Sequence, residues 1–224
     1  MKRSLILIIA FVVFISTCTS IHNGCTDQPN DLLREECLLN QSILTKDSQL
    51  CSQITTKAVR ENCIADVAIA QNDSTLCASA GAAEFYCKGN VFASQQKSEE
   101  CEHISDKFWS DFCNMKIAHT SLHPETCKQI DAPITRDECY DSLGRNLSRS
   151  DLCPNIYDLG KRNGCLTTVA MNTRNISVCD GIENTVWREG NCYYRLAKET
   201  KTEAWCDRIK TNEIKQICKK SFLH

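Results

Sequence analysis

Residues 127–153 read CKQIDAPITRDECYDSLGRNLSRSDLC and contain one complete repeating unit of the chain. Cys127 and Cys139 stand 12 residues apart, and Cys153 opens the next unit 14 residues later. From Cys25 to Cys218 the steps between cysteines are 12, 14, 12, 14, 10, 14, 12, 14, 12, 14, 12, 14, 13, 14 and 12. A period of about 26 residues, repeated eight times, indicates a stacked array of small units rather than a single globular core.

The residues around the first cysteine of each unit predict a short helix. The residue three positions after this cysteine is isoleucine in six units, and the residue before it is often apolar, which places apolar groups on one helical face. Four residues before it stand good helix-capping residues in several units. These capping residues are Asp47, Asp73, Asn175 and Thr202.

The second cysteine lies in a longer helical pattern. A large apolar residue follows four positions later and a small residue five positions later in most units, as in a helix packed against a close neighbour. No alternation with period two is visible, which argues against strands. The sequence therefore predicts an all-α fold, a short α-solenoid of about eight helical hairpins. The unequal steps Cys77–Cys87 and Cys179–Cys192 are expected to change the turn inside their hairpins.

The spacing also predicts how the cysteines pair. Within a unit they lie at comparable distances from the turn, so an antiparallel hairpin brings them level at the separation that a disulfide prefers. Pairing across the junction to the next unit has unequal offsets and would leave Cys25 and Cys218 without partners. The predicted disulfides are Cys25–Cys37, Cys51–Cys63, Cys77–Cys87, Cys101–Cys113, Cys127–Cys139, Cys153–Cys165, Cys179–Cys192 and Cys206–Cys218.

The N-terminus has the layout of a secretory signal. Lys2 and Arg3 precede an apolar run from Leu5 to Ile15 and a small polar stretch that ends at Ser20. We expect residues 1–20 to be a signal peptide and residues 21–224 to be a single cysteine-rich repeat domain. Two alternatives remain, an uncleaved membrane anchor and a lipoprotein signal that leaves a lipid on Cys18. An exported chain meets an oxidising environment in which disulfides persist.

Composition and motifs exclude several functional classes. The formal net charge is −2 and there is no basic stripe, which argues against nucleic acid as a partner. The sequence contains no C-x-x-C pair and no Ser–His–Asp or Cys–His constellation, so we expect no enzymatic activity, no cofactor and no metal ligands. The alternative use of so many cysteines is a thiol-based protein that sequesters Cu(I) or Zn.

Three kinds of surface residue are candidates for a function. N-x-S sequons at Asn40, Asn72, Asn146 and Asn175 are possible glycosylation sites. Aromatic residues gather where the repeat is least regular, which makes Phe85, Tyr86, Phe108 and Trp109 a candidate binding surface. A basic residue three positions before the second cysteine recurs along the chain. We interpret it as a structural group, either a solvated helix side chain or one that bonds the last carbonyls of the previous helix, with a ligand-binding row as the alternative.

The repeat as a whole, with Ile at position 4, a basic residue at 10 and the second cysteine at 13, resembles exported cysteine-rich α-hairpin repeat proteins of archaeal type. The architecture is similar to that of tetratricopeptide and Sel1-like solenoids, without the Trp/Gly/Tyr signature of the former. The resemblance covers residues 25–224. By analogy with solenoids that bind ligands on an extended surface, we expect a secreted or cell-surface binding or structural module with a protein or peptide partner. We expect contact with a membrane only through the N-terminal signal or a lipid on Cys18.

Overall fold

The computed structural model describes residues 24–223, so the predicted signal peptide and Cys18 lie outside the described residues. Residues 24–223 contain helices and turns and no strand, and none of their helices is long and apolar enough for a membrane crossing. The short helices are η1 (Leu50–Gln53), η2 (Ser74–Ser79), η3 (Gly81–Ala83), α5 (Ser98–Glu102), η4 (Pro124–Gln129), η5 (Cys153–Asn155), η6 (Ile176–Gly181) and η8 (Glu203–Arg208). The long helices are α2 (Asp31–Thr45), α3 (Lys57–Gln71), α4 (Glu84–Gln95), α6 (Lys107–Ser121), α7 (Pro133–Leu147), α8 (Leu159–Thr173), the π-helix η7 (Trp187–Tyr193) continued by α9 (Tyr194–Thr200), and α10 (Asn212–Lys220).

All eight predicted disulfides are confirmed. Each joins the two cysteines of one hairpin, with Cα–Cα separations between 5.4 and 5.8 Å. We number the hairpins one to eight by these disulfides, from Cys25–Cys37 to Cys206–Cys218. The all-α repeat fold is therefore confirmed, and so many disulfides indicate an oxidising environment.

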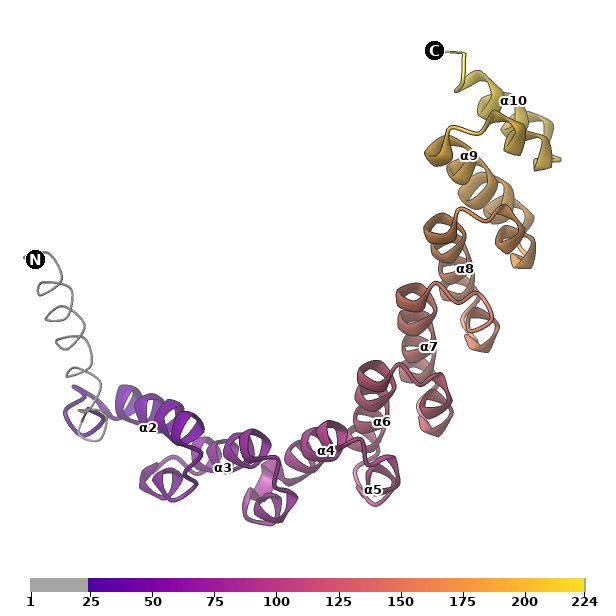
Figure 1. Cartoon of the computed structure of the whole chain (residues 1–224). Coiled ribbons are helices and arrows are strands. Elements are labelled where there is room, and N and C mark those ends of the chain that lie inside the picture. The colour runs from indigo at the N-terminus through magenta and orange to yellow at the C-terminus, as the bar shows by residue number, and fades with distance from the viewer. Residues whose placement is uncertain (1–23, 224) are drawn as a thin grey trace, which may run out of the picture. The chain divides into compact units, whose positions relative to one another are not determined.

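The chain divides into two compact units, one ending at Val91 and the other beginning at Phe92. The division falls within α4 of hairpin three. In the first unit α2 packs against α3, and in the second unit α6, α7 and α8 pack in chain order as neighbours (Figure 1).

The short helices are mostly 3₁₀ turns of three to six residues rather than α-helices. Such turns are common as short pieces. Asp73 and Asn175 cap two of them as predicted, accepting bonds from the backbone of Thr75 and Ser177. In six hairpins an isoleucine follows three positions after the first cysteine, is 0–3% exposed and packs beside the disulfide. Sulfur and isoleucine together form the core of these six hairpins. The isoleucines are Ile54, Ile104, Ile130, Ile156, Ile182 and Ile209.

The small residue five positions after the second cysteine lets the next hairpin approach. Ala118, Ala170 and Ala197 are fully buried. At the same position in α7, a Cβ atom on Gly144 would lie 2.8 Å from the Sγ of Cys165 in hairpin six. The disulfide of one hairpin therefore packs directly on the small residue of the hairpin before it.

Seven long helices end in one residue with left-handed backbone, and none of these residues is glycine. They are Lys46, Asn72, Gln96, Leu122, Ser148, Arg174 and Lys201, with φ between 52° and 59°. The backbone N–H of the following residue donates to a carbonyl in the last turn of the helix, as Arg149 does to Gly144 at 2.9 Å. This hydrogen bond is the Schellman closure, which turns the chain into the next short helix.

A carboxylate two or three residues before the second cysteine bonds the backbone of the next hairpin. In α7, Asp137 is 4% exposed and accepts hydrogen bonds from the backbone N–H groups of Tyr157 and Asp158, both at 2.8 Å. We call such a residue a clamp carboxylate. Glu35, Glu61, Asp111 and Glu189 act in the same way on hairpins two, three, five and eight. Hairpin three has Phe85 at this position, and an aromatic ring offers no carboxylate.

The recurrent basic residue has the structural role that the sequence favours. Arg60, Arg162 and Arg188 donate to the carbonyl of the isoleucine that ends the short helix of their own hairpin, at 2.7, 2.8 and 3.0 Å. Arg136 makes the same contact at 3.5 Å. This arginine therefore joins the two helices of a hairpin beside the disulfide.

One expectation about the spacing is wrong. The extra residue between Cys179 and Cys192 does not lengthen the turn but is absorbed in the helix, which runs as a π-helix from Trp187 to Tyr193. A single inserted residue is accommodated in this way without shifting the flanking turns. In the shortened hairpin three the turn does change: Gly81 has φ +55°, and a Cβ atom there would collide with Glu61.

Candidate binding pockets between hairpins

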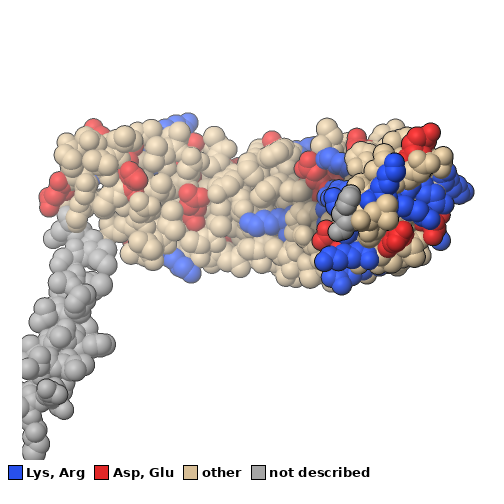
Figure 2. Space-filling model, turned by 90° about the horizontal axis from the view of Figure 1, so that it is seen from above, with Lys and Arg blue, Asp and Glu red and all other residues tan. Residues whose placement is uncertain are grey.

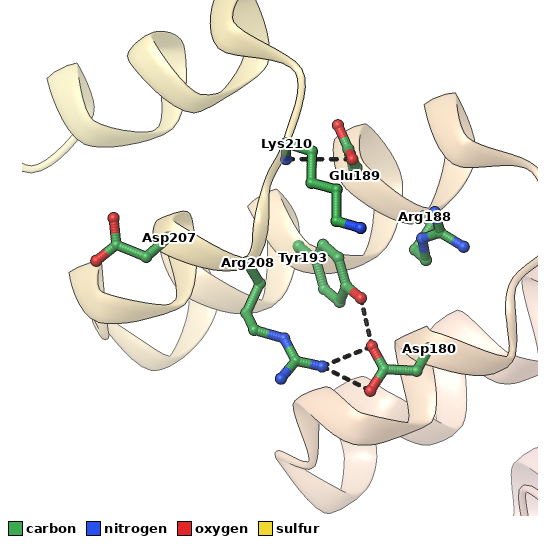
Figure 3. Close-up of a pocket in the computed structure, with 7 residues that line it drawn as sticks. All are labelled: Asp180, Arg188, Glu189, Tyr193, Asp207, Arg208 and Lys210. Carbon is green, nitrogen blue, oxygen red and sulfur yellow. Dashed lines mark hydrogen bonds and ion pairs between the residues drawn. The ribbon is translucent and has the colours of Figure 1, made fainter.

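A pocket of about 490 Å³ lies between hairpins seven and eight, in the second unit. Its side chains come from the end of η6, from η7, and from η8 and the turn that follows (Figure 3). The lining residues are Asp180, Arg188, Glu189, Tyr193, Asp207, Arg208 and Lys210.

A carboxylate inside this pocket is held by a phenol and a guanidinium. Nη2 of Arg208 donates to both carboxylate oxygens of Asp180 at 2.7 and 2.6 Å, and the Tyr193 hydroxyl donates to the same carboxylate (Figure 3). Burial alone would raise the pKa of Asp180, but these hydrogen bonds outweigh it and lower the pKa. The pKa of Tyr193 is raised by burial and by its bond to Asp180. The pair is therefore an ionised carboxylate with a neutral phenol.

The other two carboxylates of the pocket also have partners. Glu189 is the clamp carboxylate of Lys210 and Thr211, and these bonds lower its pKa in spite of its burial. Asp207 forms an ion pair with Lys219 at 2.8 Å. The ammonium of Lys210 forms no hydrogen bond or ion pair with the described residues. Each carboxylate of the pocket is therefore paired with a cation or with backbone N–H groups.

Two further pockets adjoin each other between hairpins five and six. A pocket of about 350 Å³ is lined by Lys128, Arg136, Tyr140, Pro154, Asn155, Ile156, Tyr157 and Arg162. A more apolar pocket of about 660 Å³ is lined by Pro133, Ile134, Asp137, Tyr157, Asp158, Leu159, Gly160 and Arg162. We call them the Tyr140 pocket and the Ile134 pocket. They share Tyr157, which is 83% exposed, and Arg162.

A row of exposed apolar side chains marks one edge of the second unit. Phe108, Ile134 and Leu159 occupy the first or second position of α6, α7 and α8, and Val186 directly precedes η7; the four are 56–72% exposed. Because each stands three or four residues after the isoleucine that ends the short helix, they lie along one edge of the stacked hairpins. We call this edge the turn edge. Ile134 and Leu159 are close enough to line the same pocket.

The predicted aromatic surface is divided between the two units. Phe85 and Tyr86 lie in α4 before Val91, and the Tyr86 hydroxyl bonds Asp66 at 3.1 Å. Phe108 and Trp109 lie in α6 of the second unit with their rings edge to face at 5.0 Å. Phe108 belongs to the turn edge, whereas Trp109 is half-buried. A binding role for these four residues stays a prediction, and the pockets described above lie in later hairpins.

The four sequon asparagines are all exposed. Asn72 is the residue that ends α3, Asn146 is in the last turn of α7, and Asn175 follows α8. Asn40 lies in the second half of α2. A 15-residue helix is about 22 Å long, so Asn146 and Asn175 lie at the opposite end of α7 and α8 from the turn edge. Glycosylation stays a prediction.

Basic side chains gather over the C-terminal hairpins, as the space-filling view shows (Figure 2). Residues 195–220 carry eight Lys and Arg against four Asp and Glu.

No set of three or more His, Cys, Asp and Glu side chains among residues 24–223 is arranged to hold a metal ion. The thiol-based alternative requires thiolates, and the sixteen cysteines of the described residues are all in disulfides.

The sequence patterns did not reveal the clamp carboxylates or the pockets. A signal for the clamps was present, because an acid stands two residues before the second cysteine in four hairpins. Tyr140 and Tyr193 each follow a second cysteine directly, but only two hairpins have tyrosine there.

Comparisons with protein-family models, curated proteins and solved structures give no match, so the resemblance to exported α-hairpin repeat proteins stays a prediction.

Proposed function

We propose that this chain is exported and acts outside the cytoplasm, secreted or at the cell surface, as a non-enzymatic module that binds a protein or peptide. The observation that carries the proposal is the row of exposed apolar side chains along the turn edge, with pockets between the hairpins beside it. Exposed apolar residues are ordinary when scattered, but equivalent ones on consecutive repeats form a continuous surface.

Rigidity favours binding at this edge. A disulfide and an arginine contact tie the short helix to the long helix in hairpins five, six and seven. A preorganised surface loses little conformational freedom when a partner binds, so more of the contact energy remains as affinity. Side chains such as Ile134 and Val186 would each contribute through burial of apolar area, at about 25 cal/mol per Å².

Selection from a displayed library of random short peptides against the oxidised protein tests the proposal. We expect binders whose affinity falls at least about tenfold in the double variant Ile134→Ser/Val186→Ser. Leu44→Ser is the matched control, because Leu44 is 83% exposed but lies far along α2 from its turn. Binders that lose affinity equally in both variants, or the absence of any binder, would contradict the proposal.

Export is tested separately on protein from its native cell. We expect an intact mass that corresponds to a chain starting at residue 21, or to a chain with a lipid on Cys18. In either case no free thiol should be found among the remaining cysteines. An unprocessed chain recovered with about sixteen reactive thiols would contradict export and would favour the thiol-based metal-sequestering alternative.

A further inference from the structure

The Tyr140 pocket and the Tyr193 pocket, the one between hairpins seven and eight, are the same site two repeats apart. In each, the tyrosine directly follows the second cysteine and an arginine precedes that cysteine, Arg136 in one and Arg188 in the other. In each, the opposite wall is formed by residues that follow the first cysteine of the next hairpin. The two pockets can therefore be compared position by position.

The residue that follows the first cysteine of the hairpin differs between them. In the Tyr193 pocket it is Asp180, whose carboxylate accepts bonds from the tyrosine hydroxyl and from Arg208. In the Tyr140 pocket it is Lys128, and no Asp or Glu is among the lining residues. The chain thus places a carboxylate in the lining of one copy of the site and none in the lining of the other, beside which the exposed Glu125 pairs with Lys128.

The Tyr140 pocket keeps the groups that would bind a carboxylate. Tyr140 is 4% exposed, and its hydroxyl makes no hydrogen bond within the described part of the chain. Burial raises the pKa of Tyr140, so the phenol is a neutral hydrogen-bond donor.

Three cations line the same pocket as Tyr140. Arg162 uses Nε for the Ile156 carbonyl at 2.8 Å, and its nearest carboxylate is that of Glu183, 3.7 Å from Nη1. Arg136 makes one long bond of 3.5 Å to a carbonyl. Lys128 pairs at 2.5 Å only with Glu125, which is exposed. Exposed pairs of this kind are worth little, so a ligand can compete for the ammonium.

The Ile134 pocket directly adjoins the Tyr140 pocket. Tyr157 and Arg162 line both pockets, and Ile134 and Leu159 of the turn edge also line the Ile134 pocket. Residues of an extended chain advance by about 3.3 Å each, so side chains one or two residues apart can enter neighbouring pockets.

We propose that the Tyr140 pocket binds an acidic side chain of an extended peptide segment, and that the Ile134 pocket takes a large apolar side chain one or two residues away from it. This inference rests on the proposed function and names the chemistry of its partner. Asp180 shows the binding mode: the ligand carboxylate accepts a hydrogen bond from the hydroxyl of Tyr140, as the carboxylate of Asp180 does from the hydroxyl of Tyr193. Asn155 stands at the position of Arg208, so Arg136 or Arg162 would supply the guanidinium in the Tyr140 pocket.

The charge reversal Lys128→Asp tests this mode directly, because it gives the Tyr140 pocket a carboxylate of its own at the position of Asp180. Lys128 is exposed, so we expect the variant to fold with all eight disulfides. Lys220→Asp is the control, with the same change of charge at an exposed residue outside the pockets. Tyr157→Ser removes the wall that the two pockets share.

The probes are capped synthetic peptides chosen from the random-peptide selection, each with an Asn-for-Asp or Gln-for-Glu counterpart. We expect the selected sequences to pair an acid with a large apolar residue, the amide counterpart to bind at least about tenfold more weakly, and Lys128→Asp and Tyr157→Ser to lower affinity by a similar factor. Lys220→Asp should bind as the unaltered protein does.

The outcomes separate this inference from the proposed function. If selected peptides show no acidic preference, or bind Lys128→Asp as tightly as Lys220→Asp, the acidic-peptide site is refuted while peptide binding stands. If no peptide is selected at all, both proposals fail.

Discussion

Replacing Asp137 by alanine should open the junction between hairpins five and six. The Asp137 carboxylate accepts two hydrogen bonds of 2.8 Å from the backbone of Tyr157 and Asp158, which lie in the turn of the next hairpin. Alanine removes both acceptors and leaves two backbone N–H groups to find water. Because the carboxylate is only 4% exposed, water can replace it only by entering the interface between hairpins.

The expected cost follows from the two lost bonds. A hydrogen bond to a charged group contributes about 1.5–3 kcal/mol net. The side chains of Tyr157 and Asp158 are exposed, so the freed N–H groups recover part of this from solvent. We therefore expect Asp137→Ala to destabilise the junction by about 2–4 kcal/mol. Asp137→Asn keeps one acceptor oxygen and should cost about half as much.

Hydrogen exchange on the oxidised protein measures this cost locally. The backbone amide of Cys165, near the middle of α8, reports opening of hairpin six, and its protection should fall roughly 30- to 900-fold in Asp137→Ala. Glu138→Ala is the matched control, since the neighbouring Glu138 forms an exposed ion pair with Lys161 at 3.0 Å. Such pairs contribute about 0–1 kcal/mol. Equal protection of Cys165 in the two variants would refute the clamp as a source of stability.

Four further substitutions test other parts of the repeat. Gly144→Ala places a Cβ atom 2.8 Å from the Sγ of Cys165, which the disulfide holds in place, so thermal unfolding should show a loss of about 1–3 kcal/mol. A Cβ atom at Gly164 would contact only the end of the flexible Arg145 side chain, so Gly164→Ala should be neutral or stabilising. Equal effects of Gly144→Ala and Gly164→Ala on stability would contradict the close packing of the disulfide on Gly144. Leu122→Gly relieves the left-handed backbone at φ 58° and should stabilise the protein by about 1 kcal/mol, whereas a lower melting temperature would contradict this. The pKa of Glu35 is lowered to about 2, chiefly by the hydrogen bond from the Thr55 side chain. Its contribution to the free energy of unfolding is therefore full above pH 4.5 and is lost as the pH falls toward 2. In Glu35→Gln the free energy of unfolding should lack this pH-dependent contribution, and a pH profile identical to that of the unaltered protein would contradict it.

The disulfide framework could be predicted because it depends on distance along the chain alone. In a hairpin, two residues come level when they are about equally far from the turn, and the cysteine steps meet that condition in every unit. The arginine before the second cysteine was also interpreted correctly, because helix ends leave carbonyl groups that need donors.

The clamp carboxylates could not be predicted in the same way. Asp137 bonds backbone N–H groups 20 and 21 residues away, and a backbone donor has no residue type that a pattern could reveal. The π-helix was missed for a related reason: the spacing shows that one residue was inserted before Cys192 but not whether a turn or a helix absorbs it. The pockets combine residues of two hairpins, so they depend on packing between units.

Every disulfide of the described residues closes a short segment, because its two cysteines stand only 10 to 13 positions apart in the sequence. A nascent chain that enters an oxidising compartment from its N-terminus can therefore complete each bridge as soon as the second sulfur emerges, before any later cysteine can compete for it. Oxidation would then proceed vectorially, and whole units could be gained or lost in evolution without leaving an unpaired thiol.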